Sequence, residues 1–194
     1  MFEAISLETD KVMLTPLKQI HLESLLKAGS HPDIWQWVFF NYCENKPVIT
    51  KWFEETAQFN CQSQLVMAII DKTSNTLVGT TRLFRLDPVH QSAEVGHTFV
   101  AKSAQKTHVN THAKYLLLNH AFEQLNLTRV TFCTHENNSI SRNAIARLGA
   151  RFEGIAYKQR KLPDGTFRNT ATFSIVDEQW PNIKQNLITQ LSRS

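Results

Sequence analysis

The order of strand-like and helix-like segments between residues 64 and 135 constrains the fold most. Three successive segments have the composition and turn-bounded lengths of strands: QLVMAIID (64–71), TLVGTTRLFRL (76–86) and SAEVGHTFV (92–100). The short connections DKTSN and DPVHQ predict tight turns, and hence an antiparallel meander. A helix beginning near Asn110 or Thr111 and a strand RVTFCTH (129–135) come next. A strand-helix-strand order predicts two parallel neighbours joined by a right-handed crossover, so we expect a mixed α/β fold.

The segments on either side of this core are expected to extend the sheet and to cover it. KVMLTPL (11–17) is predicted to be a short strand, in which Pro16 marks a sheet edge or a strand exit. Apolar spacing and capping residues predict the other elements. These are a helix ending at Gly29, a helix over residues 50–60 capped by Thr50, a helix over residues 139–150 ending at Gly149, two strands around LPDGT (162–166), and a final helix over residues 178–191.

Length and composition are typical of a folded protein. With 194 residues, of which 42% are hydrophobic and 20% charged, we predict a single domain over residues 1–194. Three cysteines without CxxC spacing favour a reducing compartment and argue against a disulfide framework or a zinc knuckle. The first residues lack the apolar run of a signal peptide or membrane span, so we expect a cytoplasmic protein without membrane attachment. The formal net charge of +4 is spread along the chain, which makes nucleic acid an unfavoured partner.

The polar segment SAQKTHVNTHAK (103–114) lies at the corner between the third strand and the following helix. The first backbone N–H groups of a helix have no partner within it, so they need a capping side chain, water or an anionic ligand as acceptor. A helix N-terminus at the end of a sheet strand favours a diphosphate, and Lys102 and Lys106 add positive charge. Because most helix N-termini bind only water and a cap, this segment alone leaves the ligand open.

The segment HPDIWQWVFFNY (31–42) is the most aromatic part of the chain, and Pro32 can occupy a first helical turn. Two interpretations stay open. So many rings are typical of a packed core, whereas a wall of a binding site would explain their place in a connecting segment. The candidate acceptor-binding residues are Trp35, Trp37, Tyr42, Arg82 and Tyr157.

A family resemblance covers most of the chain. Residues 78–154 read VGTTRLFRLDPVHQSAEVGHTFVAKSAQKTHVNTHAKYLLLNHAFEQLNLTRVTFCTHENNSISRNAIARLGARFEG. With the PDGT hairpin and the terminal QWP helix, this run resembles the core of the GNAT acetyltransferases over about residues 78–190, and within them the RimJ/RimL-type protein N-acetyltransferases. The resemblance implies a GNAT fold. Its central, mixed and mostly antiparallel twisted sheet has a parallel pair of strands splayed at the acetyl-CoA site, and helices on both faces.

The resemblance also implies an activity and its partners. The chain is expected to be an N-acetyltransferase that uses acetyl-CoA and needs no metal. It would transfer the acetyl group directly, in a ternary complex, to a primary amine. A protein N-terminal amine is the expected acceptor, and a small-molecule amine is the alternative. A rival from another class is a non-catalytic acyl-CoA-binding module, and whether the chain forms a homodimer is left open.

The same resemblance assigns the pyrophosphate of acetyl-CoA to the corner. The implied contacts are Gln105, Lys106, Thr107, His108, Val109, Asn110 and Thr111. Many family members have glycine where this chain has His108 and Asn110, and glycine permits positive φ and close backbone approach. Asparagine also tolerates unusual φ and can cap a helix, so we expect binding to survive this departure.

The catalytic roles are likewise implied by resemblance. Glu94 would remove the proton of the incoming ammonium, directly or through water, while the main chain at Phe99 and Val100 would pair with the pantetheine arm. Asn138 is assigned to the same arm and Ser141 to protonation of the leaving thiolate, although both residues can simply cap the following helix. The position where many members have a tyrosine acid is Ile145, which disfavours a tyrosine mechanism.

Several other reactive side chains are given structural roles. Period two places Glu94 on one strand face with Gly96 and Thr98, and His97 on the opposite face, so we expect His97 to be structural. Cys133 is expected to be a buried thiol. Two further histidines, His108 and His112, lack the glutamate of HExxH and a clear third ligand, so we expect exposed side chains and no metal.

Overall fold

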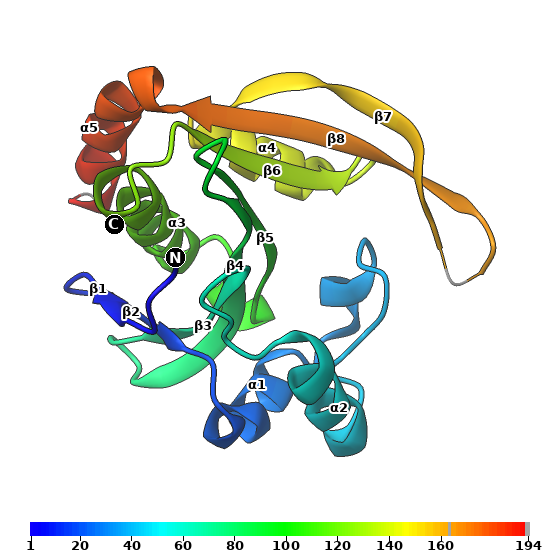
Figure 1. Cartoon of the computed structure of the whole chain (residues 1–194). Coiled ribbons are helices and arrows are strands. Elements are labelled where there is room, and N and C mark those ends of the chain that lie inside the picture. Colours follow the sequence, from blue (N-terminus) through cyan, green and yellow to red (C-terminus); the bar gives the residue numbers. More distant parts are fainter. Residues whose placement is uncertain (163, 193–194) are drawn as a thin grey trace.

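A computed structural model, which describes residues 1–162 and 164–192, forms an eight-stranded sheet with the strand order β1-β2-β3-β4-β5-β6-β8-β7 (Figure 1). The strands are β1 (Leu7–Glu8), β2 (Val12–Pro16), β3 (Gln64–Asp71), β4 (Thr76–Asp87), β5 (Ser92–Val100), β6 (Arg129–His135), β7 (Arg151–Lys161) and β8 (Phe167–Val176). The α-helices are α1 (Leu22–Ala28), α2 (Lys46–Thr56), α3 (Val109–Asn119), α4 (Ser139–Arg147) and α5 (Trp180–Leu191). Short 3-10 turns cover Gln19–His21, Pro32–Trp35, Lys102–Ala104 and Asp177–Gln179, and a π-helical turn, His120–Gln124, continues α3.

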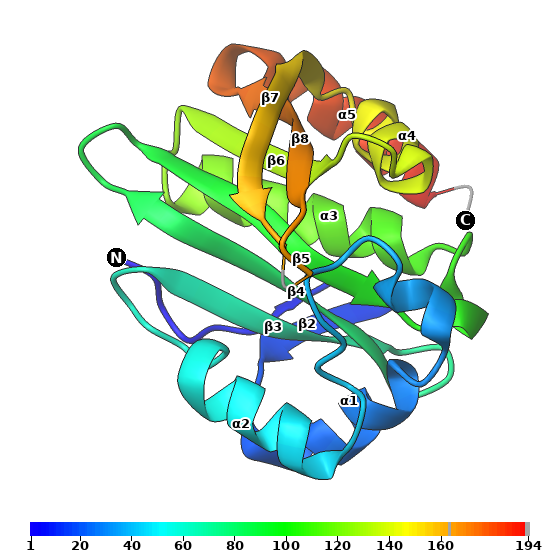
Figure 2. The ribbon, with the colours of Figure 1, turned by 90° about the vertical axis from the view of Figure 1, so that its right-hand side faces the viewer.

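The strand directions confirm the predicted mixed fold. Strands β3, β4 and β5 form the expected antiparallel meander, and β5 pairs with β6 in parallel across the α3 connection. The other neighbouring pairs among the described residues are antiparallel. The parallel pairing is short, running only from Ser92 opposite Arg129 to Glu94 opposite Thr131, and Figure 2 shows the two strands diverging beyond it.

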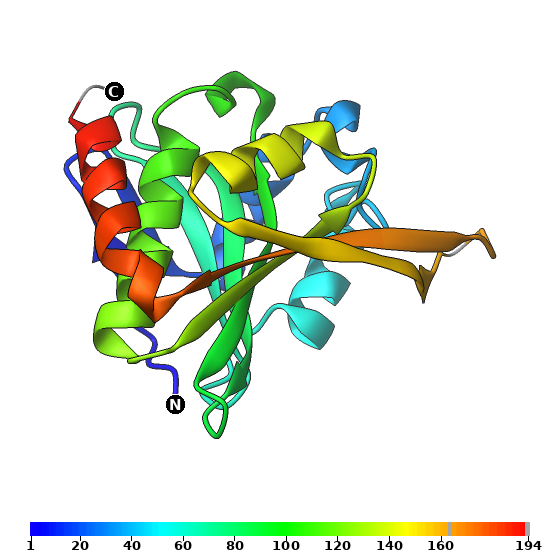
Figure 3. The same cartoon turned by 90° about the horizontal axis from the view of Figure 1, so that it is seen from above.

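Helices cover both faces of the sheet (Figure 3). On one face, α3 contacts β2, β5 and α5, and its apolar positions, such as Leu117 and Leu118, are fully buried. On the other face, α1 contacts β4 and α2. The consecutive apolar residues YLLL point to more than one side of the helix, and α3 is covered on more than one side because it packs against α5 as well as the sheet. Among the described residues, no helix is long and apolar enough to span a membrane.

The β7–β8 hairpin extends beyond the rest of the molecule in Figures 1 and 3. Both strands predicted around LPDGT are present, while residue 163 of the predicted turn lies outside the described residues. The register between the strands shifts after Ala156, and an irregular stretch precedes Arg160 opposite Arg168. The hairpin therefore carries two arginines side by side.

The start of α2 differs from the prediction. The helix begins at Lys46 rather than at Thr50, because the Asn45 Oδ1 accepts a hydrogen bond from the Val48 N–H at 3.0 Å and Pro47 occupies the first turn. Asparagine is a strong cap and proline has the φ of a first helical turn, so this start prevails over a threonine cap four residues later. Thr50 lies inside the helix.

Replacing Asn45 by alanine is expected to lower the free energy of unfolding by about 1 kcal/mol, because the Val48 N–H loses its acceptor. Thr50→Ala should change it by less than about 0.5 kcal/mol. Urea unfolding of both variants, followed by circular dichroism, measures the difference. A greater loss for Thr50→Ala would contradict this assignment of the cap.

Candidate functional site

Glu94 lies where the parallel strands separate. It is the last β5 residue that pairs with β6, and only 9% of its surface is exposed. Beyond it, β5 remains paired with β4 on its other side, with Phe99 opposite Thr80 and Val100 opposite Gly79. The β6-facing edge of β5 is therefore free of strand pairing after Glu94 in the described structure, which leaves it available to an extended ligand.

A β-bulge in β5 changes which side chains share a face with Glu94. Gly96 pairs with Arg82 but Phe99 pairs with Thr80, so two residues of β5 lie opposite one residue of β4. His97 has a φ of 47° and packs its ring against Phe84, the residue opposite Glu94. The expectation that His97 lies on the other face is therefore wrong, because the extra residue reverses the alternation.

The bulge turns Thr98 toward the other face of the sheet, so the predicted grouping of Thr98 with Glu94 is also wrong. Its Oγ1 accepts a hydrogen bond from the Lys114 Nζ of α3 at 2.7 Å, and the Thr81 Oγ1 accepts a second from that Nζ at 3.2 Å. Lys114 is only 7% exposed, and burial lowers its pKa to about 7. The Lys114 amine, which has no carboxylate partner among the described residues, thus contacts the bulge from the α3 face of the sheet.

This burial predicts a pH dependence of stability. Between about pH 7 and 10 the unfolded chain binds more protons at residue 114 than the folded chain does, so burial of Lys114 costs less as the pH rises. Its contribution to the free energy of unfolding should rise by up to about 1.4 kcal/mol per pH unit. Urea unfolding at several pH values should show a smaller slope for Lys114→Met than for the wild type. The exposed control Lys27→Met should keep the wild-type slope, and parallel slopes for all three proteins would contradict the prediction.

Two residues that the sequence did not single out for this site contact Glu94. The Arg85 Nη1 donates to the Glu94 Oε2 at 2.7 Å. The Cys133 thiol of β6 lies near Glu94, and its pKa is raised by burial and then by the negative charge of Glu94. Cys133 is half-buried rather than an isolated core thiol. The proximity of Arg85 and Cys133 to Glu94 depends on strand register and on the positive φ of Arg85, 54°. The periodicity of the sequence reveals neither.

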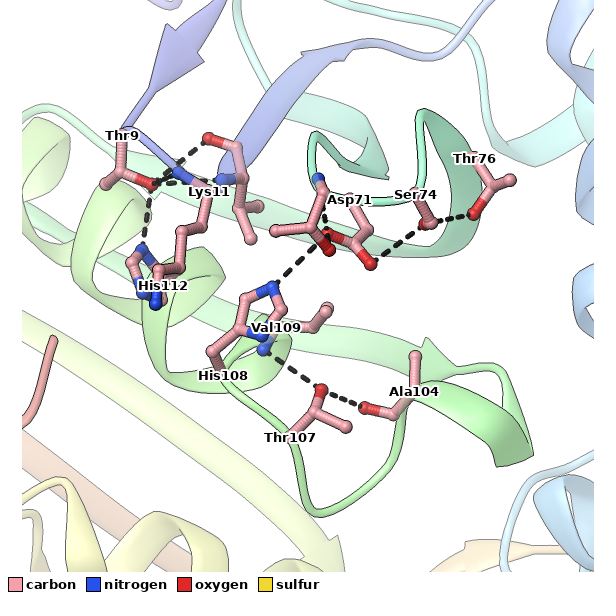
Figure 4. A network of polar contacts seen from close by, with 12 residues as sticks. Thr9, Lys11, Asp71, Ser74, Thr76, Ala104, Thr107, His108, Val109 and His112 are labelled. Carbon is pink, nitrogen blue, oxygen red and sulfur yellow. Dashed lines mark hydrogen bonds and ion pairs between the residues drawn. The ribbon is translucent and has the colours of Figure 1, made fainter. Parts of the chain in front are cut away.

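The corner between β5 and α3 has the polar network drawn in Figure 4. The His108 Nε2 lies 3.2 Å from the Asp71 Oδ1 at the end of β3, and the Thr107 Oγ1 donates to the Ala104 carbonyl at 2.7 Å. His108 has a φ of −60°, whereas the positive φ of this corner, 61°, occurs at Lys106. A histidine at a glycine position of the family pattern is therefore unstrained here.

The first turn of α3 has unsatisfied backbone donors. The helix starts at Val109, whose N–H has only a long contact of 3.3 Å with the Thr107 Oγ1, and the preceding residue provides no side-chain cap. Asn110 and Thr111 follow within the first turn, and their N–H groups find no acceptor among the described residues. These donors and the helix dipole fit the oxygens of a diphosphate. The side chain of Gln105, another predicted contact, donates to the Val100 carbonyl at 3.1 Å.

Asn138 and Ser141 lie at the start of α4, directly after β6. The Asn138 Oδ1 accepts from the Ser141 N–H at 3.0 Å, so the side chain caps the helix, as the structural alternative predicted. Its Nδ2 group and the Ser141 hydroxyl make no hydrogen bond with a described residue. The capping role therefore leaves both groups available to a ligand.

The residues of the aromatic segment, residues 35–42, differ in what they pack against. Tyr42 is buried and stacks on Trp52 at 4.0 Å between ring centroids, and burial raises its pKa. Trp35 packs against Tyr42 and Phe99, so it joins the segment to β5. Trp37 instead contacts the ring of His135 in β6, with centroids 4.8 Å apart.

The two remaining acceptor candidates have different surroundings. Arg82 is 6% exposed and lies on the Glu94 face, opposite Gly96. Tyr157 is 77% exposed on β7 and makes no ring contact with the aromatic segment in the described structure. The structure thus brings Arg82, but not Tyr157, to the neighbourhood of Glu94.

The predicted exposed histidines of α3 are not exposed. His112 is fully buried and its Nδ1 lies 2.8 Å from the Thr9 Oγ1, because the chain around β1 and β2 covers this side of the helix. His108 is half-buried against Asp71. Within the described ranges, no group of three or more His, Cys, Asp or Glu side chains could hold a metal ion.

Comparisons with known proteins agree with this architecture. The family described as "Acetyltransferase (GNAT) domain" matches residues 11–151. A Bacillus subtilis (strain 168) protein named "Putative ribosomal N-acetyltransferase YdaF" is 31% identical over 109 residues, which cover 56% of this chain and 58% of that protein. The chain thus matches less than two thirds of the length of this relative.

Solved structures extend the likeness to the whole fold. A GCN5-related N-acetyltransferase from Brucella melitensis has a TM-score of 0.91 at 30% identity, covering 97% of this chain and 86% of the other. Mycobacterium smegmatis RimJ, solved in complex with CoA-disulfide, has a TM-score of 0.74 at 21% identity over 92% and 88% of the two chains, and it shows the shared fold alone. Because the family match covers most of the residues and the sheet separates at a buried glutamate, the chain belongs to the GNAT acetyltransferase family.

Proposed function

We propose that this chain transfers an acetyl group from acetyl-CoA directly to the N-terminal amine of a protein or peptide. The observation that carries the proposal is the buried carboxylate of Glu94 at the point where β5 leaves β6. Among the described residues, a strand edge free of strand pairing lies beside a proton acceptor. This arrangement could position a thioester next to a group that removes the proton of an amine. The name of the Bacillus subtilis relative supports a ribosomal protein as the source of the amine.

The residues present fit acetyl-CoA as the donor substrate. In the proposal, the N–H groups of Asn110 and Thr111 bind its diphosphate, and the main chain of Phe99 and Val100 pairs with the pantetheine arm. Lys106, whose positive φ shapes the corner, adds charge there. Acetyl-CoA itself supplies the activated acetyl group.

The chain's own side chains would handle the protons. Glu94 accepts a proton from the incoming ammonium, directly or through water, and the resulting amine is the nucleophile. The Arg85 guanidinium occupies the Oε2 of Glu94, so Oε1 is the oxygen that we assign to this step. The Ser141 hydroxyl, which has no partner among the described residues, is assigned to proton donation toward the leaving thiolate, and the Asn138 Nδ2 to the CoA arm.

The experiment that tests this function measures thiol release from acetyl-CoA. The acceptors are a set of short peptides with free N-termini, the same peptides with blocked N-termini, and a set of small amines. We expect release with free peptides and none with blocked ones. Release with small amines alone would instead support an acetyltransferase for small molecules.

The same experiment separates an enzyme from a binding module. CoA binding, measured by calorimetry, is expected for both. A chain that binds CoA but releases no thiol with any amine would be an acyl-CoA-binding module, and the proposed function would then be wrong.

A further inference from the structure

Two buried arginines on the Glu94 face of the sheet have no carboxylate partner among the described residues. Arg82 in β4 is 6% exposed and Arg168 in β8 is 8% exposed. The Nε of each is buried without a hydrogen-bond partner in the described structure. Arg82 donates only to the neutral Gln64 Oε1, at 2.9 Å, and Arg168 donates no hydrogen bond to a described residue.

The contacts of Arg168 do not neutralise its charge. Its guanidinium lies 5.0 Å from the centre of the Phe39 ring, and the guanidinium of Arg160 lies 5.5 Å from the same ring. A ring attracts a cation but carries no net charge. The pKa of Arg168 is lowered by burial and then by Arg160, whose charge has the same sign. An anion between these groups would relieve both effects.

Strand pairing and ring contacts place two arginines beside His97 on this face of the sheet. Arg82 lies opposite Gly96, and the Arg85 guanidinium lies 5.4 Å from the centre of the Phe84 ring, against which His97 packs. The pKa of His97 is lowered by burial and then by the charges of four arginines. The four, which we call the arginine cluster, are Arg82, Arg85, Arg160 and Arg168. The carboxylate of Glu94, which raises the pKa of Arg168, is already paired with Arg85. The cluster thus has a strong excess of positive charge.

That excess is a poor environment for an acceptor that carries only an ammonium group. Like charges repel across a partly buried site, where water screens them weakly. A buried guanidinium without a partner is also costly, so Arg82 and Arg168 contribute little to the stability of the fold as they stand. An acceptor that carries a negative group would reduce both the repulsion of its ammonium group and the cost of the buried guanidinium groups. Guanidinium groups bind carboxylates with short, charge-assisted hydrogen bonds.

We propose that the arginine cluster binds a carboxylate of the acceptor close to the amine that Glu94 deprotonates. This inference rests on the proposed function and narrows it to acceptors that carry an acidic group. Two sources share the chemistry: an acidic side chain next to a protein N-terminus, and the α-carboxylate of a free amino acid. Arg168 and Arg82 would fix the carboxylate, and Phe39 would hold the guanidinium of Arg168 in place.

The test compares acceptors with and without a carboxylate. One pair is a tetrapeptide amide with glutamate at its second position and the same peptide with glutamine. The other pair is free alanine and alaninamide. We expect kcat/KM to favour the acidic member by about 10- to 100-fold, the usual range for a hydrogen bond to a charged group. A preference in the peptide pair identifies a side-chain carboxylate, and a preference in the alanine pair identifies the α-carboxylate.

Three variants assign the preference to the cluster. Arg168→Gln should lower kcat/KM for the preferred acidic acceptor by about 10- to 100-fold, and for its neutral counterpart by less than about threefold. Arg168→Lys, which keeps the charge, should retain part of the preference. Arg151→Gln changes an exposed arginine of β7 and should leave both values as in the wild type. Unfolding temperatures and CoA affinity identify any variant that is misfolded.

A binding measurement keeps this inference separate from the proposed function. The N-acetylated forms of both acceptor pairs are titrated into the protein in the presence of CoA, which requires no turnover. Tighter binding of the acidic member of either pair, lost in Arg168→Gln, supports the inference. Equal or absent binding within both pairs overturns it. A wild type that releases no thiol with any amine contradicts the proposed function instead.

Discussion

Replacing Glu94 with glutamine is expected to lower the turnover number by about 10²- to 10⁴-fold, because the amide cannot accept the proton of the acceptor ammonium. The affinity for CoA should change by less than about threefold, since the proposed diphosphate contacts come from the first turn of α3. The two measurements are initial rates of thiol release and calorimetric titration with CoA. Loss of both activity and CoA binding would point to a damaged fold.

A matched control is needed because Glu94→Gln also breaks the ion pair with Arg85, whose atoms lie 2.7 Å apart. Arg85→Gln breaks the same pair but keeps the carboxylate. We therefore expect a smaller loss of turnover, within about tenfold, for Arg85→Gln. Equal losses in the two variants would mean that the ion pair, and not proton removal, accounts for the effect.

Replacing Asn110 with aspartate should raise the dissociation constant for CoA by about 10- to 100-fold, equivalent to about 1.4–2.8 kcal/mol. The change adds one negative charge, with almost no change in shape, where the diphosphate is proposed to bind. The same charge favours the N-terminus of an isolated helix, so the free energy of unfolding should rise slightly, by about 0.3–1 kcal/mol. Weaker binding in a protein that is no less stable would be evidence against general damage.

Asn182→Asp is the control for this prediction. Asn182 is an exposed residue in the first turn of α5, so its replacement adds the same charge at another helix N-terminus. Stability should again rise slightly, while CoA affinity should remain as in the wild type. If Asn110→Asp also leaves CoA affinity unchanged, the diphosphate does not bind at the start of α3.

Regular segments with clear turn signals could be predicted closely from the sequence. The predicted bounds of β3, β5 and β6 agree with the structure, because each of these strands is a run of apolar and β-branched residues between turn or loop residues. The residue pattern placed Glu94 on the strand before the corner, and the family resemblance gave it a catalytic role. Its position at the separation of β5 and β6 follows from a pairing of only three residues, Ser92 to Glu94.

What could not be predicted depends on local irregularity and on contacts between distant segments. One additional residue at the β5 bulge moved His97 to the Glu94 face, and a strict period of two cannot represent such a residue. The ring contacts between Phe39 and two arginines of the β7–β8 hairpin join residues more than a hundred positions apart. Similarly, the residue with positive φ in the corner is Lys106. It lies two residues before His108, which occupies a glycine position of the family pattern.

The aromatic segment is anchored at both ends and in its middle. Trp35 packs on Phe99 of β5, and Tyr42 is stacked on Trp52, while Phe39 between them contacts arginines of the β7–β8 hairpin. Residues 36–41 belong to no strand of the described structure, although Trp37 and Phe39 contact side chains of the sheet. Under the proposed function, exchange of residues 36–41 between relatives is a route by which evolution, or an engineer, could change the preferred amine while the proposed acetyl-CoA contacts of β5 and α3 stay intact.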